Sequence, residues 1–206
     1  DAQYYMIFGE RSNGKSYAVD KYILDKFFQD GEQFAFVKRY EDDIKTKYMS
    51  EVFTPLEPYI LENYGYRLKF YRGQWLVYED GTEGKISECK VMGYAFSLNN
   101  VNRTKATSYP NVTTILFEEF MSIDCTYLPD ELNLFLNLIS TIVRYRHNVK
   151  IFMLANAISK YSPYSEALGI RLHRLKKGEI VTREYRDKKG FVTRFAIERS
   201  ENVNVF

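Results

Sequence analysis

The residues with the clearest chemical meaning stand near the start of the chain, in the run GERSNGKS at positions 9–16. The spacing G-x-x-x-x-G-K-[ST] is typical of a phosphate-binding loop, where glycine backbone approaches an anion and the next helix offers unpaired N–H groups. We expect Lys15 on the β- and γ-phosphates and the Ser16 hydroxyl on Mg²⁺. An apolar run at positions 4–8 precedes this loop, and a helical pattern follows it.

The predicted nucleotide-binding residues extend one position past this run. They are Gly9, Glu10, Arg11, Ser12, Asn13, Gly14, Lys15, Ser16 and Tyr17. The role of Arg11 stays open between a position near the γ-phosphate and one near a later acid, Glu119.

Two acids end a second apolar run. Residues 111–117 are NVTTILF, and Glu118 and Glu119 follow them. A buried strand ending in two acids can hold Mg²⁺ through water with the first and orient or deprotonate an attacking water with the second. Adjacent acids are common on protein surfaces, so it is their place after a phosphate loop and a buried strand that favours the functional interpretation.

Polar residues also follow the remaining apolar segments. Asn156 follows the run VKIFMLA at 149–155. It could hydrogen-bond a γ-phosphate or the attacking water, or be a satisfied amide at the edge of the core. Arg144 and Arg146 end a helical pattern, where cations also suit the negative end of the helix dipole. Both alternatives stay open for all three residues.

A parallel sheet is the element that would bring these groups together. Apolar residues at 19, 22, 23 and 27 form one stripe of a helix that Gly31 ends, and residues 34–37 are typical of a buried parallel strand. We therefore expect an α/β fold built from a βαβ unit. Residues 38–40, KRY, would then form either a ligand-facing loop or an ordinary exposed turn.

The length favours one main domain over residues 1–206, with two additional β patterns. Residues 67–98 predict a β-hairpin or meander inserted between the two halves of the sheet. Residues 165–206 predict a C-terminal extension whose last part is a hairpin.

Composition says more about the cellular compartment of the protein than about its function. A net charge of +2 does not by itself indicate a nucleic-acid partner, although basic residues gather at 171–177. Cys89 and Cys125 lack metal-ligand spacing, which indicates reduced thiols in a cytosolic setting. No apolar run is long enough to span a bilayer and no signal peptide is evident, so we expect no membrane partner.

In combination these parts resemble the additional-strand, catalytic-glutamate (RecA-like) P-loop ATPases. Residues 9–16 match the Walker A motif, ILFEEF at 115–120 matches Walker B, and LANA at 154–157 matches an Asn-ended coupling strand. More narrowly, the chain resembles the DNA-packaging motor ATPases, large-terminase relatives, of small phi-29-like tailed phages. That resemblance rests on G-x-R-x-x-G-K-S at the loop, GEQF at 31–34, YPNV at 109–112 and NAIS at 156–159, and it covers about residues 5–164.

The resemblance implies ATP hydrolysis with Mg²⁺ in a homo-oligomeric ring of five subunits. Such a ring works in the host cytoplasm, on the portal vertex of a procapsid, and moves double-stranded DNA inward; whether a structural RNA takes part is left open. Carried over to this sequence, Lys15 and Ser16 bind phosphate and Mg²⁺, Glu119 is the catalytic base and Asn156 is the sensor.

Three basic residues match positions that act on a neighbouring subunit. Arg144 matches the family's trans-acting arginine finger, with Arg146 as the fallback, and Lys105 matches a second cation that reaches a neighbour's nucleotide. A cation supplied in trans stabilises charge on the transferring phosphoryl group and makes hydrolysis depend on ring contacts.

The sequence departs from the family in two ways. Glu118 stands where relatives have Asp, and the extra methylene makes its role at Mg²⁺ less certain than that of Glu119. Relatives carry a C-terminal nuclease-like domain, whereas we expect this chain to be the ATPase domain alone. The alternatives are another ring-forming NTPase (a helicase or DNA-transfer pump), a small-molecule P-loop kinase, and a nucleotide-dependent structural protein.

Overall fold

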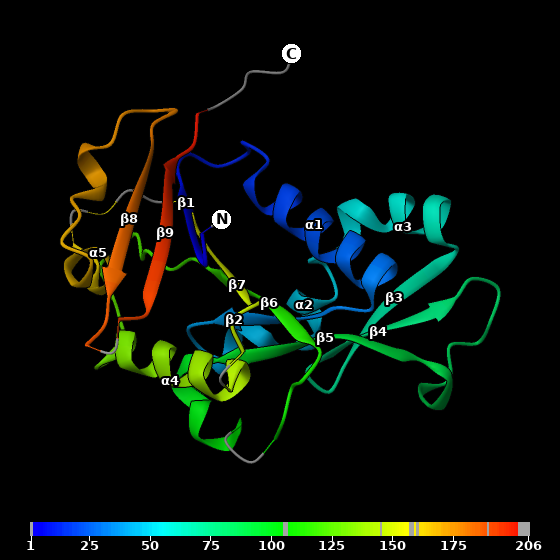
Figure 1. Cartoon of the computed structure of the whole chain (residues 1–206). Helices are drawn as coiled ribbons and strands as arrows, with labels where there is room; N and C mark the ends of the chain where they lie inside the picture. The colour runs from blue at the N-terminus through cyan, green and yellow to red at the C-terminus, as the bar shows by residue number, and fades with distance from the viewer. Residues whose placement is uncertain are drawn as a thin grey trace.

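A nine-stranded sheet runs through the part of the chain that the structure, a computed structural model, describes: residues 2–104, 107–144, 146–156, 159, 161–188 and 190–201. Its strand order is β3-β4-β5-β2-β6-β7-β1-β9-β8 (Figure 1). The strands are β1 (Tyr4–Phe8), β2 (Gln33–Lys38), β3 (Tyr66–Tyr71), β4 (Gln74–Glu79), β5 (Lys90–Ser97), β6 (Val112–Glu118), β7 (Lys150–Ala155), β8 (Ile180–Arg186) and β9 (Val192–Arg199). The α-helices are α1 (Lys15–Asp30), α2 (Thr46–Met49), α3 (Glu57–Tyr64), α4 (Glu131–Val143) and α5 (Pro163–Ala167).

The centre of the sheet is parallel, as predicted. β2 pairs in parallel with β5 and β6, β7 with β6 and β1, and β1 with β9. The antiparallel pairs lie at the two margins, where β3 and β4 extend one side and β8 extends the other. This arrangement is an α/β fold with a mostly parallel sheet.

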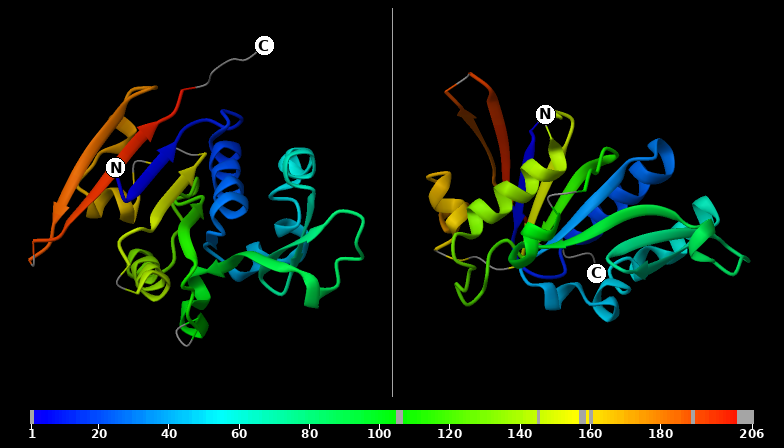
Figure 2. Two further views of the ribbon diagram at one scale, coloured as in Figure 1. Left: turned by 45° about the vertical axis from the view of Figure 1, so that its right-hand side comes forward. Right: turned by 90° about the horizontal axis from the view of Figure 1, so that it is seen from below.

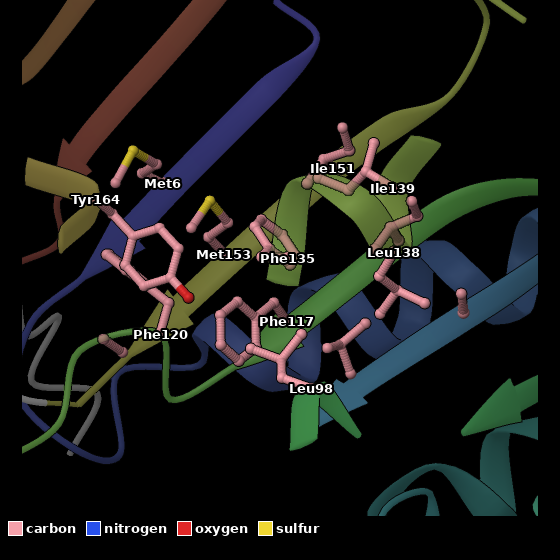
Figure 3. Packing of buried hydrophobic residues seen from close by; sticks show 14 of the residues in the cluster. Met6, Leu98, Phe117, Phe120, Phe135, Leu138, Ile139, Ile151, Met153 and Tyr164 are labelled. Atoms are coloured by element: carbon pink, nitrogen blue, oxygen red, sulfur yellow. The ribbon is translucent and has the colours of Figure 1, made fainter. Parts of the chain in front are cut away.

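Helices cover both faces of the sheet. α1 and α3 lie on one face and α4 on the other (Figure 2). Successive residues of β6 therefore enter different cores: Ile115 and Phe117 pack on the α4 side, and Leu116 packs on the α1 side. On the α4 side, Phe135 and Leu138 of α4 pack with residues of the sheet (Figure 3). Burial on both faces explains why these strands are continuous apolar runs.

The helix after the phosphate loop ends where the sequence predicts. Gly31 takes φ 71°, and its N–H donates to the carbonyls of Lys26 and Phe27. A glycine suits this left-handed position because it carries no Cβ. The strands predicted at 4–8, 34–37, 111–117 and 149–155 are also confirmed, within one residue at most ends.

The strands at residues 67–98 form a meander, since β3 pairs antiparallel with β4 and β4 with β5, and this meander lies at one margin of the sheet. β5 pairs in parallel with β2, and β3 and β4 continue the same sheet outward. The pairing places Gly93 beside Phe34, and a Cβ at Gly93 would collide with the Phe34 ring. The C-terminal hairpin likewise extends the sheet, through β9 on β1. No helix among the described residues has the length and apolarity needed to cross a membrane.

Candidate nucleotide-binding site

The carboxyl ends of three neighbouring strands meet at one edge of the sheet. Phe8 of β1 lies opposite Ala155 of β7, and Glu118 of β6 lies opposite Leu154. The phosphate loop follows Phe8, the two acids end β6, and Asn156 follows β7. Open α/β sheets bind ligands at this kind of edge, so the topology collects groups that are far apart in the sequence.

The phosphate loop and Asn156 form one hollow of about 220 Å³. It is lined by Ser12, Asn13, Gly14, Lys15, Ser16, Tyr17 and Asn156. Larger hollows lie beside α3 and along α4, away from this edge. This hollow is the candidate nucleotide site because of its loop and not because of its size. Backbone N–H groups at a helix N-terminus, together with a lysine, are groups that can bind an anion. Glu10, Arg11 and Tyr17 are exposed around it.

Lys15 is held by the loop itself. Its Nζ donates to the Glu10 carbonyl and to Asn13 Oδ1, both at 2.7 Å. The side chain is buried, and burial lowers the pKa of Lys15 from its usual value. The two loop acceptors occupy an ammonium that a phosphate would otherwise bind.

The residue that follows β9, Ser200, contacts the phosphate loop. Ser200 donates its N–H to the Phe8 carbonyl at 2.8 Å, and Asn13 Nδ2 donates to Ser200 Oγ at 2.5 Å. A Cβ at Gly9 would collide with Ser200 Oγ, so this close approach requires glycine at the start of the loop. The sequence patterns do not indicate this contact, because Ser200 lies 187 positions from Asn13.

Glu118 is engaged by a lysine. Its Oε2 lies 2.9 Å from Lys38 Nζ, and both side chains are mostly buried. Asp20 of α1 is close enough for the charge of Glu118 to act on it: burial, reinforced by Glu118, raises the pKa of Asp20 well above its usual value. Asp20 Oδ1 is buried and lacks a hydrogen-bond partner among the described residues. Sequence patterns miss Asp20, because it is not one of the apolar positions that predict this helix.

These groups fit a magnesium ion in kind. Mg²⁺ takes oxygen ligands and keeps several waters, and Ser16 and Glu118 would supply a hydroxyl and a carboxylate. Within the described residues no group of three or more His, Cys, Asp or Glu side chains could hold a metal ion by itself. Any ion here would therefore be shared with waters and with phosphate oxygens.

Arg39, in the predicted loop after β2, is buried, and its guanidinium faces an acid. Only 7% of its surface is exposed, and its guanidinium forms an ion pair with Glu131 at 2.7 Å. The same guanidinium donates to the carbonyls of Glu119 and Phe120 at 3.1 and 3.2 Å. Arg39 therefore matches neither interpretation, because it pairs with a buried acid that no local pattern reveals, whereas Lys38 pairs with Glu118 and Tyr40 is exposed.

The two candidate finger residues lie at the opposite edge of the sheet. Arg144 follows α4 in a left-handed conformation with φ 40°, and its exposed side chain donates to the Thr107 carbonyl at 2.9 Å. Arg146 donates to five backbone carbonyls, those of Tyr109, Pro110, Val112, Ile142 and Val143. Lys105 lies outside the described residues. Arg146 therefore holds this end of α4 to the segment before β6 and to the start of that strand.

Arg146→Ala should destabilise the fold. It removes five bonds to backbone carbonyls, and hydrogen bonds from charged donors are worth about 2 kcal/mol each when their partners are left without a replacement. We expect the free energy of unfolding in urea to fall by at least about 2 kcal/mol. Arg67→Ala, which loses only an exposed pair with Asp80, is the control and should cost less than about 1 kcal/mol. Equal losses in both variants would contradict the structural role.

Known proteins resemble the chain over most of its length. The family model described as podovirus DNA encapsidation protein (Gp16) matches residues 2–171. The DNA packaging protein of Bacillus phage phi29 is 33% identical over 162 residues, which are 77% of this chain and 44% of that protein. The chain thus spans less than half the length of that relative.

Solved structures share the fold. The N-terminal domain of the DNA packaging ATPase from bacteriophage phi29 matches with a TM-score of 0.77 and 26% identity, over 100% of this chain and 93% of that one. The large terminase ATPase domain of Thermus phage P74-26 matches with a TM-score of 0.52 and 12% identity, over 97% of this chain and 76% of that one. The second likeness concerns the fold alone.

Proposed function

Because the chain belongs to the family of podovirus DNA encapsidation proteins (Gp16), we propose that it is the ATP-hydrolysing domain of a viral DNA-packaging motor. The observation that carries the proposal is the convergence of the phosphate loop, the paired acids and Asn156 at one edge of the sheet. The finer fold class, an additional-strand ATPase, is also a proposal. β7 lies between β1 and β6, as the extra strand does in additional-strand, catalytic-glutamate (RecA-like) ATPases.

Each residue at this edge has a task in the proposed reaction. The loop N–H groups and Lys15 would hold the β- and γ-phosphates of ATP, and Ser16 and Glu118 would hold Mg²⁺. The ion would neutralise charge on the phosphate oxygens. Glu119 orients and deprotonates the attacking water, and Asn156 hydrogen-bonds the γ-phosphate or that water.

The position of Arg144 supports assembly of the chain into a ring. It precedes β7, whose carboxyl end reaches the phosphate loop, and six residues of strand span about 20 Å. This separation argues against a role for Arg144 at the nucleotide of its own subunit, and in a ring it would act on the nucleotide of a neighbour. We propose a homo-oligomeric ring, of five subunits as in the resemblance, that acts with double-stranded DNA at a procapsid portal.

Lys15→Ala should weaken nucleotide binding by at least about tenfold. The variant loses a charge-assisted bond to phosphate, worth about 1.5–3 kcal/mol. Titration with a fluorescent ATP analogue in the presence of Mg²⁺ measures the affinity. Lys26→Ala, on the same helix and paired with Asp30 at the surface, is the matched control and should bind as the wild type does. Unchanged affinity in Lys15→Ala would refute the site assignment.

Activators of hydrolysis separate the proposal from its alternatives. A packaging ATPase should turn over ATP faster with double-stranded DNA and faster still with procapsids that carry a portal. A helicase or transfer pump should respond to DNA alone. A small-molecule kinase should turn over ATP with a nucleoside or metabolite and without DNA, and a structural protein should not hydrolyse ATP at all.

A further inference from the structure

The backbone of Glu119 has an unusual conformation at the end of β6. Its φ is 59°, in the left-handed region that residues with a Cβ rarely adopt. The next residue, Phe120, is fully buried, and its N–H donates to the Leu154 carbonyl of β7 at 3.1 Å. Such a conformation persists only where surrounding contacts hold it.

Arg39 supplies contacts on the other side of this turn. One of its terminal nitrogens donates to the Glu119 carbonyl at 3.1 Å and to the Phe120 carbonyl at 3.2 Å. The planar guanidinium also lies 5.2 Å from the Tyr127 ring. Arg39 thus bonds the carbonyl of the residue proposed to orient the attacking water, without touching any group that lines the phosphate hollow.

Glu131 holds Arg39 in this orientation. The guanidinium donates to both carboxylate oxygens, at 2.7 and 3.0 Å, and the Glu131 side chain is completely buried. Each oxygen accepts one more bond: Oε2 from the Leu128 N–H and Oε1 from the Tyr164 hydroxyl, both at 2.8 Å. Burial, together with the charge of Glu131, raises the pKa of Tyr164, so its hydroxyl stays a donor.

The contacts to the two carbonyls decide what this network does. A buried ion pair is weak evidence for stability, because apolar replacement of both partners is often neutral. Arg39 and Glu131 share two bonds, and the terminal nitrogen that bonds Glu131 Oε1 also reaches both carbonyls of the turn after β6. We propose that Arg39 is a positioning residue that sets the backbone of Glu119, with Glu131 and Tyr164 fixing Arg39. This inference rests on the proposed function, in which Glu119 acts on the attacking water.

Arg39→Lys is the sharpest test, because it keeps the charge but not the planar fork. A single ammonium cannot hold both Glu131 oxygens and the two carbonyls in one geometry. Misplacing a reacting group by about 1 Å can cost about 10²-fold in rate, so we expect the kcat of ATP hydrolysis to fall about 10- to 100-fold. The KM for ATP and the affinity for a non-hydrolysable ATP analogue with Mg²⁺ should stay within about twofold. Arg67→Lys, at an exposed Arg–Asp pair on β3, is the control and should leave all three values unchanged.

A second pair of variants guards against a failure to fold. Glu131→Gln keeps Arg39 and an acceptor for Tyr164, so it should retain more turnover than Arg39→Met/Glu131→Gln, which leaves no buried charge unpaired. Wild-type kcat in folded Arg39→Lys overturns the inference, as does a kcat that falls only in step with thermal stability. Unfolding of every Arg39 variant overturns it too, because the network would then serve the fold alone. Failure of the proposed function looks different: the wild type would not hydrolyse ATP, or Glu119→Gln would retain full turnover.

Discussion

Glu119→Gln should lower ATP turnover about a thousandfold while nucleotide affinity stays within a factor of about two. A general base contributes about 10²- to 10⁴-fold to a proton-transfer step, and an amide cannot accept the proton of the attacking water. Gln keeps the length of the side chain and the bond that the Glu119 carbonyl accepts from Arg39. Steady-state hydrolysis and binding of a fluorescent ATP analogue measure the two effects separately.

The control for this variant is another acid in the same loop. Asp124→Asn, at an exposed position after β6, should hydrolyse ATP at the wild-type rate. Near-normal turnover by Glu119→Gln would remove Glu119 from the mechanism and would count against the whole assignment. A loss of nucleotide affinity equal to the loss of turnover would instead indicate a binding role.

Arg144→Ala should reduce hydrolysis by the assembled protein by at least about a thousandfold. Arginine fingers are worth about 10³–10⁵ in rate, because they neutralise charge on the transferring phosphoryl group. Arg144 is exposed at the edge opposite to the phosphate loop, so under the proposed trans role the loss should appear only in the assembled protein. Nucleotide affinity of the separate subunits should not change.

Mixing dead subunits tests whether Arg144 acts in trans. Arg144→Ala subunits keep Lys15 and Glu119, and Lys15→Ala subunits keep Arg144, so a mixed ring contains interfaces with every required group. We expect the mixture to regain activity that neither variant has alone. Lys15→Ala mixed with Glu119→Gln is the control, because every subunit then has a defective loop or base, and it should stay inactive. If Arg144→Ala assembles with ATP and both mixtures stay inactive, Arg144 is not the finger.

Local patterns predict the frame of the site well. The strands before the loop, before the acids and before Asn156 are continuous apolar runs, because each is buried on both faces of the sheet. The glycine and lysine spacing of the loop is itself typical of phosphate-binding loops. Since parallel strands place their carboxyl ends together, the convergence of these groups follows from the order of strands and helices.

The residues that local patterns miss are those whose partners are far away in the chain. Arg39 pairs with Glu131, 92 positions later, and nothing near either residue indicates the other. Asp20 stands in a helix as any solvent-facing acid could, yet it is buried beside Lys38 and Glu118. Local patterns also do not indicate that β5 pairs in parallel with β2, where Gly93 leaves room for the Phe34 ring. Helical and strand periodicity carry no information on such long-range contacts.

The place of β1 in the sheet has a consequence for how the chain folds. Tyr4, at the start of β1, pairs with Ile151 of β7 and with Phe195 of β9. During synthesis β1 therefore stays without its partners until β7, and then β9, have been made. Pairings this distant lengthen the mean contact separation, which slows folding. The contacts between the phosphate loop and Ser200 should therefore form only after β9 has joined β1.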